Sequence, residues 1–181
     1  MCYFKEKIPQ FQKFINNTVD YSDFLLNVVG KSGDRKYLIL FQNNSELRPT
    51  GGFPGTYGIL DFEGGYFKNI FVDDIYNPDG QIRTNIIPPK ELQHITPTWG
   101  MRDAAWFADF PASAKKVMDM YELDSGPSVD GVFTVTPVII SRILEITGSV
   151  EMPEYGVNLN ADNFLAEVQE EVEYGDNKNV N

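Results

Sequence analysis

The feature that most constrains the fold is a short apolar run, Tyr37–Phe41 (YLILF), which gives way at once to Gln42, Asn43 and Asn44. An apolar run of strand length without polar alternation is typical of a strand that is covered on both faces. We therefore expect residues 37–41 to form a central strand, with other elements packed on both sides of its sheet.

Further strands are indicated downstream of this run. Tyr57–Phe62 and Tyr66–Ile75 predict a hairpin, because Glu63–Gly65 places glycines where a positive φ is needed. Another strand is expected at Val129–Val135 and a short edge strand at Val150–Met152.

Three helix signals accompany the strands. Asp109 opens a helix that ends near Gly126, and Thr136 reads as the N-cap of a second helix that stops at Gly148. Asn160 caps a last helix that extends to about Val172. The second helix has an apolar stripe that we expect to be buried: Val138, Ile139, Ile143, Leu144 and Ile146. In the last helix we expect Phe164, Leu165 and Val168 to be buried.

The pattern of elements predicts the fold class and the organisation of the chain. Residues 8–28 indicate one interrupted helix or two short helices, so residues 1–35 are predicted to be an N-terminal helical segment. Residues 36–181 are predicted to form a single α/β (α+β) domain with three layers, a central mixed sheet flanked by helices. Within it, residues 76–99 predict a long irregular crossing with one short helix near 90–94, and such a loop is more often functional than idle.

Composition excludes several classes of protein. The 26 acidic against 15 basic residues give a net charge of −11, which argues against a nucleic-acid surface. A single histidine, His94, excludes a multi-histidine zinc site and reads best as a surface or loop residue. A single cysteine, Cys2, excludes a disulfide within the chain. No apolar run is long enough to span a membrane, and the N-terminus lacks the apolar region of a signal peptide.

A glycine-rich loop after the central strand, Arg48–Gly58 (RPTGGFPGTYG), is the first candidate site. Glycines allow backbone N–H groups to approach an anion closely, and an arginine offers a planar fork for phosphate or carboxylate. The alternative is a tight strand connection in which Arg48 forms a structural salt bridge.

Acidic residues at a strand end form the second candidate. Asp73 and Asp74 end the second strand of the hairpin, and Asp79 follows in a turn with Gly80. Carboxylates in such a place can hold a divalent cation, but the spacing does not match a calcium-binding EF-hand loop. The alternative is that these are solvated turn carboxylates.

The third candidate is Met101–Trp106 (MRDAAW). Arg102 and Asp103, beside two alanines and Trp106, could line an anion pocket with an aromatic wall. They could equally form an internal salt bridge that fixes a loop.

Several segments, in a fixed order, carry a resemblance: LILFQNNSELRPTGGFPGTYGIL, FVDDIYNPDGQ, MRDAAWFADFPASAKKVMDMYE, VDGVFTVTPVIISRILEITGSVEMP and NADNFLAEVQEEVEYG. Together they resemble a bacterial family of uncharacterised domains found in membrane-anchored surface proteins. The resemblance runs from about residue 36 to the end, so we expect a larger parent protein whose other parts carry the membrane anchor. That family in turn is similar to the LytR-CpsA-Psr phosphotransferases, which move a glycopolymer from a polyprenyl pyrophosphate carrier onto peptidoglycan with a magnesium-type ion.

The transferase motifs fall on the three candidate segments. Their Arg-Ser-Asp-Thr stretch corresponds to the loop from Arg48 to Thr56, and their Pro-Arg-Asp strand end corresponds to residues 72–74. Their Lys-Ile-Asn-Ala-Ala-Tyr segment corresponds to residues 101–106. The resemblance thus implies that Arg48 and Arg102 neutralise pyrophosphate and that Asp74 is catalytic. It also implies the metal ligands Asp73 and Asp74 for Mg²⁺, and the ligand-binding residues Thr50, Gly51, Gly52, Thr56, Asp103 and Trp106.

Two hypotheses on function follow. The first is an extracytoplasmic domain of the bacterial cell envelope that resembles glycopolymer phosphotransferases and acts on a polyprenyl-pyrophosphate-linked glycan. The second is a non-catalytic domain of the same compartment that binds cell-wall glycan, such as peptidoglycan, or another envelope protein. Neither hypothesis involves nucleic acid.

Overall fold

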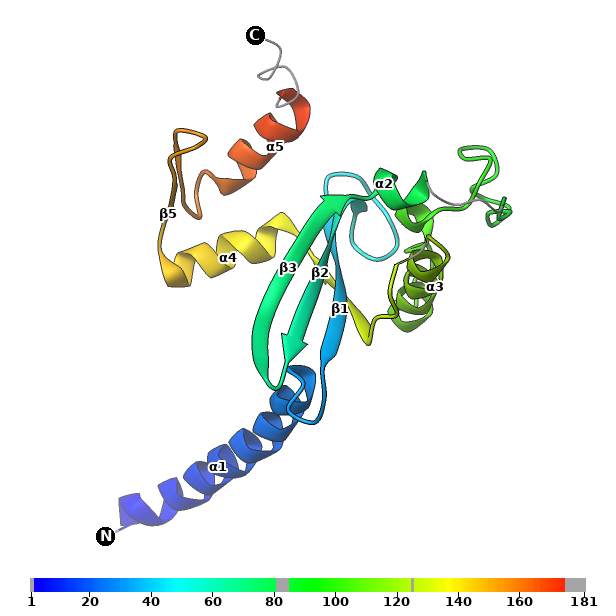
Figure 1. The fold of residues 1–181 in the computed structure, drawn as a ribbon. Helices are drawn as coiled ribbons and strands as arrows, with labels where there is room; N and C mark the ends of the chain where they lie inside the picture. Colours follow the sequence, from blue (N-terminus) through cyan, green and yellow to red (C-terminus); the bar gives the residue numbers. More distant parts are fainter. Residues whose placement is uncertain (1, 81–84, 125, 175–181) are drawn as a thin grey trace.

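The computed structural model describes residues 2–80, 85–124 and 126–174 (Figure 1). In chain order the elements are helix α1 (Cys2–Val28), strands β1 (Arg35–Asn43), β2 (Phe53–Glu63) and β3 (Tyr66–Asp74), helix α2 (Tyr76–Asp79), the 3₁₀ turn η1 (Met101–Asp103), helix α3 (Phe110–Leu123), strand β4 (Gly131–Val135), helix α4 (Pro137–Thr147), strands β5 (Val150–Met152) and β6 (Val157–Leu159), and helix α5 (Phe164–Tyr174).

The four longer strands form one mixed sheet in the order β3-β2-β1-β4. Strand β1 pairs antiparallel with β2 and parallel with β4, so the apolar run at residues 37–41 is central, as predicted. The predicted hairpin is confirmed as β2 and β3, and its turn uses Gly64 at φ 58° and Gly65 at φ 87°. The mixed α/β class predicted from the sequence is therefore confirmed.

Helix α3 begins where the sequence predicts it. The side chain of Asp109 accepts a hydrogen bond from the Ala112 N–H at 3.1 Å, which satisfies one of the free donors of the first turn. The buried Ser113 hydroxyl accepts from the Phe107 N–H at 2.9 Å and contacts the Phe107 carbonyl at 2.8 Å. These bonds fix the start of α3 against the loop before it.

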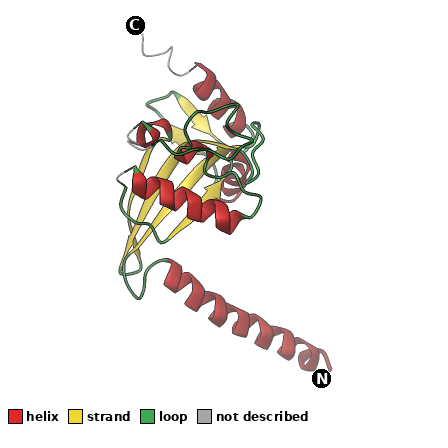
Figure 2. Cartoon of the chain, turned by 90° about the vertical axis from the view of Figure 1, so that its right-hand side faces the viewer, coloured by secondary structure: helices red, strands yellow, loops and turns green. Residues whose placement is uncertain are grey.

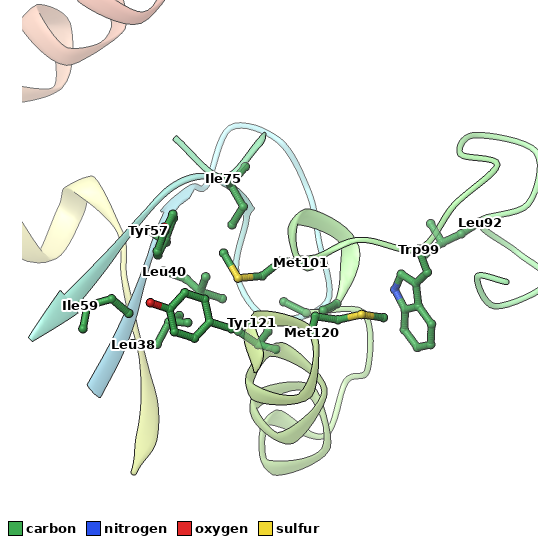
Figure 3. Packing of buried hydrophobic residues seen from close by; sticks show 13 residues of the cluster. Leu38, Leu40, Tyr57, Ile59, Ile75, Leu92, Trp99, Met101, Met120 and Tyr121 are labelled. Carbon is green, nitrogen blue, oxygen red and sulfur yellow. The ribbon is translucent and has the colours of Figure 1, made fainter. Parts of the chain in front are cut away.

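The core lies between one face of the sheet and helix α3. Leu38 and Leu40 on β1 pair with Ile59 and Tyr57 on β2, so that all four side chains lie on the same face (Figure 3). The cluster is completed by Ile75, Leu92, Trp99, Met101, Ala104, Ala105, Val117, Met120 and Tyr121. Full burial of a Leu or Ile side chain contributes about 1.5–3 kcal/mol. The core therefore ties α3 and the turn η1 to the sheet.

Helix α4 lies on the other side of the sheet from α3 (Figure 1). Its N- and C-terminal residues follow the prediction, with Thr136 at the N-cap and Gly148 at φ 88° at the C-cap. The prediction that its apolar stripe is buried is wrong except for Leu144, because α4 packs mainly against α5 and touches the sheet only lightly at β1. The exposed members are Val138, Ile139, Ile143 and Ile146. In α5, Leu165 is likewise 41% exposed, against expectation.

Helix α1 is one continuous helix that projects away from the sheet (Figures 1 and 2). The interruption expected within residues 8–28 is absent, because the polar residues at 16–20 are compatible with a helix whose surface faces solvent. The predicted division after residue 35 stays a prediction. A second difference is the short hairpin of β5 with β6, of which the sequence indicated only the first strand.

The crossing between α2 and α3 consists of turns in its described part. Bonds from the Leu92 N–H to the Pro89 carbonyl and from the Ile95 N–H to the Leu92 carbonyl, both 2.8 Å, replace the short helix expected near 90–94. Leu92 anchors this segment in the core, whereas His94 is exposed, as predicted. No helix in the described ranges combines the length and apolar character required to cross a bilayer.

Candidate functional site

Residues 44–52 join β1 to β2, so only the first part of the predicted loop Arg48–Gly58 is a loop, and residues 53–58 belong to β2. We keep the name Arg48 loop for residues 48–52, which Gln42 contacts from β1. Gln42 is 1% exposed, and its Nε2 donates to the Thr50 hydroxyl at 2.8 Å. Gly52 lies so close to β1 that a Cβ there would stand 2.3 Å from the Asn43 carbonyl oxygen. The loop can therefore follow this path only with glycine at position 52.

The turn η1 is fixed next to that loop. The Trp99 indole N–H donates to the Asp103 carbonyl at 3.0 Å, and the Thr50 hydroxyl contacts the Ala105 carbonyl at 3.4 Å. Ala104 and Ala105 are buried in the core, so the small residues of this segment serve packing. The fold thus brings the first and third candidate segments together.

The carboxylate of Asp103 connects the two arginines. Its Oδ1 lies 3.9 Å from Arg48 Nη2, and its Oδ2 lies 3.3 Å from Arg102 Nε. The Asp103 side chain is 7% exposed, whereas the arginine side chains are 28% and 29% exposed. A buried carboxylate thus holds two guanidinium groups that still reach solvent.

Asp79 adds a second carboxylate on the side of Arg102. Its Oδ1 accepts from the Met101 N–H at 2.5 Å, and its Oδ2 lies 3.8 Å from Arg102 Nε. Burial raises the pKa of Asp79 above its ordinary value, although the Met101 N–H and the charge of Arg102 act in the opposite direction. A Cβ at Gly100 would stand 2.4 Å from Asp79 Oδ2, so glycine is required there. The interpretation of Asp79 as a solvated turn carboxylate is therefore wrong.

Each arginine also lies over an aromatic ring. The guanidinium carbon of Arg48 is 5.2 Å from the centre of the Phe53 ring, and that of Arg102 is 5.1 Å from the centre of the Tyr76 ring. Such contacts orient the guanidinium plane and favour the charged group. We call the group formed by Arg48, Arg102, Asp103 and Asp79 the arginine cluster.

Asp73 and Asp74 lie at the end of β3, where the chain turns into α2. Asp73 Oδ1 accepts from the Asp74 N–H at 2.9 Å and from Asn77 Nδ2 at 2.6 Å, and Asp74 Oδ1 accepts from the Tyr76 N–H at 2.8 Å. Thr56 is the register partner of Asp74 on β2. Within the described part of the chain, neither aspartate forms an ion pair with Arg48 or Arg102. Asp74 is connected to the arginine cluster only indirectly. It accepts a hydrogen bond from the Tyr76 N–H, and the Tyr76 ring contacts the Arg102 guanidinium.

The remaining predicted residues lie in the Arg48 loop or against the core. Thr50, Gly51 and Gly52 form the loop described above, with Gly51 at φ 120°. Trp106 is partly buried and packs against the core. The roles predicted for these residues in ligand binding stay predictions.

Sequence reasoning missed three residues that shape this region: Gln42 beneath the loop, Tyr76 beneath Arg102, and Asp124. Asp124 follows α3, is 5% exposed, and has no hydrogen-bond partner for either carboxylate oxygen among the described residues. Burial, and then the charge of Asp79, raises the pKa of Asp124 from 3.8 to about 7. Only the polar Gln42 after an apolar run gave a sequence signal, because the contact of Tyr76 with Arg102 and the burial of Asp124 depend on distant segments.

A metal site does not emerge from the side chains that the structure describes. No group of three or more histidine, cysteine, aspartate or glutamate side chains among them is placed to hold a metal ion. Asp73 and Asp74 offer two adjacent carboxylates, and one oxygen of each already accepts bonds from the turn. The predicted magnesium site stays a prediction that the described residues do not complete.

The chain was compared with models of known protein families. The model described as a protein of unknown function (DUF4012) matches residues 32–173, and the chain therefore belongs to this family. No curated protein and no solved structure matches the chain.

Proposed function

We propose that this DUF4012 domain acts outside the membrane in the bacterial cell envelope and binds the pyrophosphate of a polyprenyl-linked glycan at the arginine cluster. The proposal rests on the resemblance to the LytR-CpsA-Psr phosphotransferases and on one observation. Asp103 gathers Arg48 and Arg102, which lie far apart in the sequence, into one partly exposed pair. Two adjacent guanidinium groups suit the oxygens of a pyrophosphate.

The unused donors of the arginines support this proposal. The described contacts of Arg102 use Nε, toward Asp103, and Nη2, toward the Thr96 hydroxyl at 3.3 Å, which leaves Nη1 for a ligand. Arg48 Nε is buried, so a ligand would meet this side chain at its Nη groups, of which Nη1 contacts the Leu47 carbonyl at 3.4 Å and Nη2 lies 3.9 Å from Asp103 Oδ1. Asp103 and Asp79 balance the two positive charges, so the cluster recognises an anion by directed hydrogen bonds more than by net charge.

For transfer, Asp74 is the proposed general base. It would accept the proton of an acceptor hydroxyl on peptidoglycan, whose oxygen would attack the phosphorus that carries the glycan. The bond to the bridging oxygen of the pyrophosphate would then break, and polyprenyl phosphate would leave with that oxygen. The arginines would bind the phosphate oxygens and neutralise the charge that develops on them. The described residues do not complete a site for a metal ion, so the proposed transfer relies on the two arginines and Asp74.

The second candidate is binding without transfer, to cell-wall glycan or to an envelope protein. The ion pairs of both arginines and the turn bonds of Asp73 and Asp74 favour it, since these contacts would have to be rearranged for catalysis. The two candidates share the arginine cluster and differ in the role of Asp74.

Titration of the purified chain with a short polyprenyl pyrophosphate, with and without Mg²⁺, tests the binding site. We expect Arg48→Lys and Arg102→Lys to weaken binding about tenfold or more, because lysine lacks the planar fork. Arg142→Lys is the matched control, because Arg142 pairs with Glu145 on the exposed surface of α4 at 2.8 Å. Absence of binding by the wild type, or equal losses in all three variants, would overturn the proposal.

Asp74→Asn separates the two candidates. If the domain transfers glycan, this variant binds the pyrophosphate but no longer labels peptidoglycan. If wild type and variant are both retained on isolated cell wall and neither transfers, the second candidate stands.

A further inference from the structure

Strand β3 lies at one edge of the four-stranded sheet, and several of its exposed side chains are large and apolar. Eight of its nine residues, Tyr66–Val72 and Asp74, are exposed, and Asp73 is half-buried. The large apolar side chains on it are Tyr66, Phe67, Ile70, Phe71 and Val72, with exposed fractions of 77%, 56%, 42%, 49% and 50%. Figure 1 shows β3 along the outside of the sheet with no helix drawn across it. A long, apolar edge strand with unpaired backbone groups is a template for another strand.

We propose that β3 pairs with β3 of a second copy of this chain, antiparallel and centred on Phe71, to join two four-stranded sheets into one. In this register Phe71 lies opposite Phe71 of the second copy, and Ile70 lies opposite Val72 on both sides of the axis. Lys68 lies opposite Asp74 of the second copy, also twice. Apolar residues thus meet apolar residues, and each end of the ladder has an ion pair.

Other symmetric registers lack the two ion pairs. A centre at Asn69 pairs Phe67 with Phe71 of the second copy but places Lys68 opposite Ile70. A centre at Ile70 places Lys68 opposite Val72 of the second copy and Asn69 opposite Phe71. A centre at Val72 places Phe71 opposite Asp73 of the second copy. Because a two-fold axis requires facing residues to share a face of the sheet, the centre must lie on a residue and not between two residues. The register centred on Phe71 is therefore favoured.

The charged groups that would form the two ion pairs are accessible. Lys68 Nζ pairs with Glu63 Oε2 at 2.7 Å within one hairpin, but both side chains are more than half exposed, so that this pair is weak and can be shared. Asp74 uses Oδ1 for the Tyr76 N–H, which leaves Oδ2 for Lys68 of the second copy, so that the proposed general-base role of Asp74 would belong to the monomer. The register shift between Asp61 and Phe62 leaves Lys68 without a pairing partner on β2, so the regular part of the new ladder is Asn69–Asp73. Short ladders with charged ends are reversible, and we expect a dimer that dissociates on dilution.

Charge reversal tests both the partner and the register. We expect sedimentation analysis to show a dimer for the wild type and at least about tenfold weaker self-association for Lys68→Glu and for Asp74→Lys, because each variant places like charges opposite each other twice. An equimolar mixture of the two variants restores both ion pairs and dimerises. Lys115→Glu, on the exposed face of α3, is the control and leaves the dimer intact. A monomeric wild type, or a mixture that does not dimerise although both variants are folded by circular dichroism, would overturn the proposal.

Cysteine cross-linking gives an independent readout that does not require Asp74→Lys to fold. In a Cys2→Ser background, Phe71→Cys should form a disulfide between two copies on mild oxidation, since facing residues of antiparallel strands lie within disulfide reach. Asn69→Cys should not, because Asn69 faces Asp73 of the second copy. Equal cross-linking at both positions, or none at Phe71→Cys, contradicts the register.

Discussion

Asp124 carries a carboxyl group that the fold buries without a hydrogen-bond partner in the described part of the chain. The residue is 5% exposed and directly follows the last turn of α3. Burial, and next the nearby charge of Asp79, raises the pKa of Asp124 from 3.8 to about 7. The folded chain therefore keeps this carboxyl protonated at pH values at which the unfolded chain ionises it.

This difference makes stability depend on pH with a defined sign. Below about pH 4 Asp124 is protonated in both states, so its ionisation does not affect stability. As pH rises toward about 7, ionisation of this carboxyl stabilises the unfolded state and not the folded state. The free energy of unfolding therefore falls through this window and levels off above the folded pKa. A difference of about three pKa units corresponds to roughly 4 kcal/mol.

Asp124→Asn removes the ionisation while keeping the shape of the side chain. We expect the variant to be more stable than the wild type by roughly 2–4 kcal/mol at about pH 8, less than the full difference because the buried amide also lacks partners. Near pH 4 the advantage disappears. Urea unfolding between about pH 4 and pH 8 measures both the free energy and its slope.

Asp119→Asn is the matched control, because Asp119 lies on α3 but is partly exposed and pairs with Lys115 at 3.2 Å. It should retain the pH slope of the wild type. If Asp124→Asn also retains that slope, or if the wild type does not lose stability between about pH 4 and pH 7, the carboxyl is not buried as described, and the reasoning is refuted.

Three further predictions concern the elements around the site, and thermal or urea unfolding checks each. Gly52→Ala should lower stability by about 2 kcal/mol or more, since the new Cβ would meet the Asn43 carbonyl oxygen at 2.3 Å; unchanged stability would contradict the path of the loop. Ser113→Ala should cost about 1–3 kcal/mol, because the Phe107 N–H then loses its partner at 2.9 Å, whereas Ser113→Thr should retain part of the bond. Asp109→Ala should cost about 1 kcal/mol through loss of the α3 cap, and Asp109→Ser should restore most of it.

Much of the local structure could be predicted from the sequence. The apolar run at residues 37–41, the glycines of the β2–β3 turn and the caps at Asp109 and Thr136 each act within a few residues of themselves. Such signals do not depend on what lies opposite in space. The mixed α/β class followed from the order of these elements.

The candidate site could be predicted only as separate segments. The sequence marks the Arg48 loop and the Arg102–Asp103 turn, but nothing local shows that one carboxylate lies 3.9 Å from Arg48 and 3.3 Å from Arg102. Both distances depend on the packing of η1 against the sheet through Met101 and Ala104. The burial of Asp79 and Asp124 likewise depends on tertiary packing, because the residues that cover these two carboxyl groups are distant from them in the chain.

The sequence by itself determined the strands of the main sheet, the glycine turn between β2 and β3 and the starts of α3 and α4, because backbone preferences and apolar patterns act locally. The tertiary structure alone decided the pairing of β1 with β4, the exposure of the α4 stripe and the meeting of the two arginines on Asp103. The physical reason is the range of the interactions. A turn or a cap satisfies hydrogen bonds within a few residues, whereas burial and charge pairing are set by whichever segments the whole chain brings together.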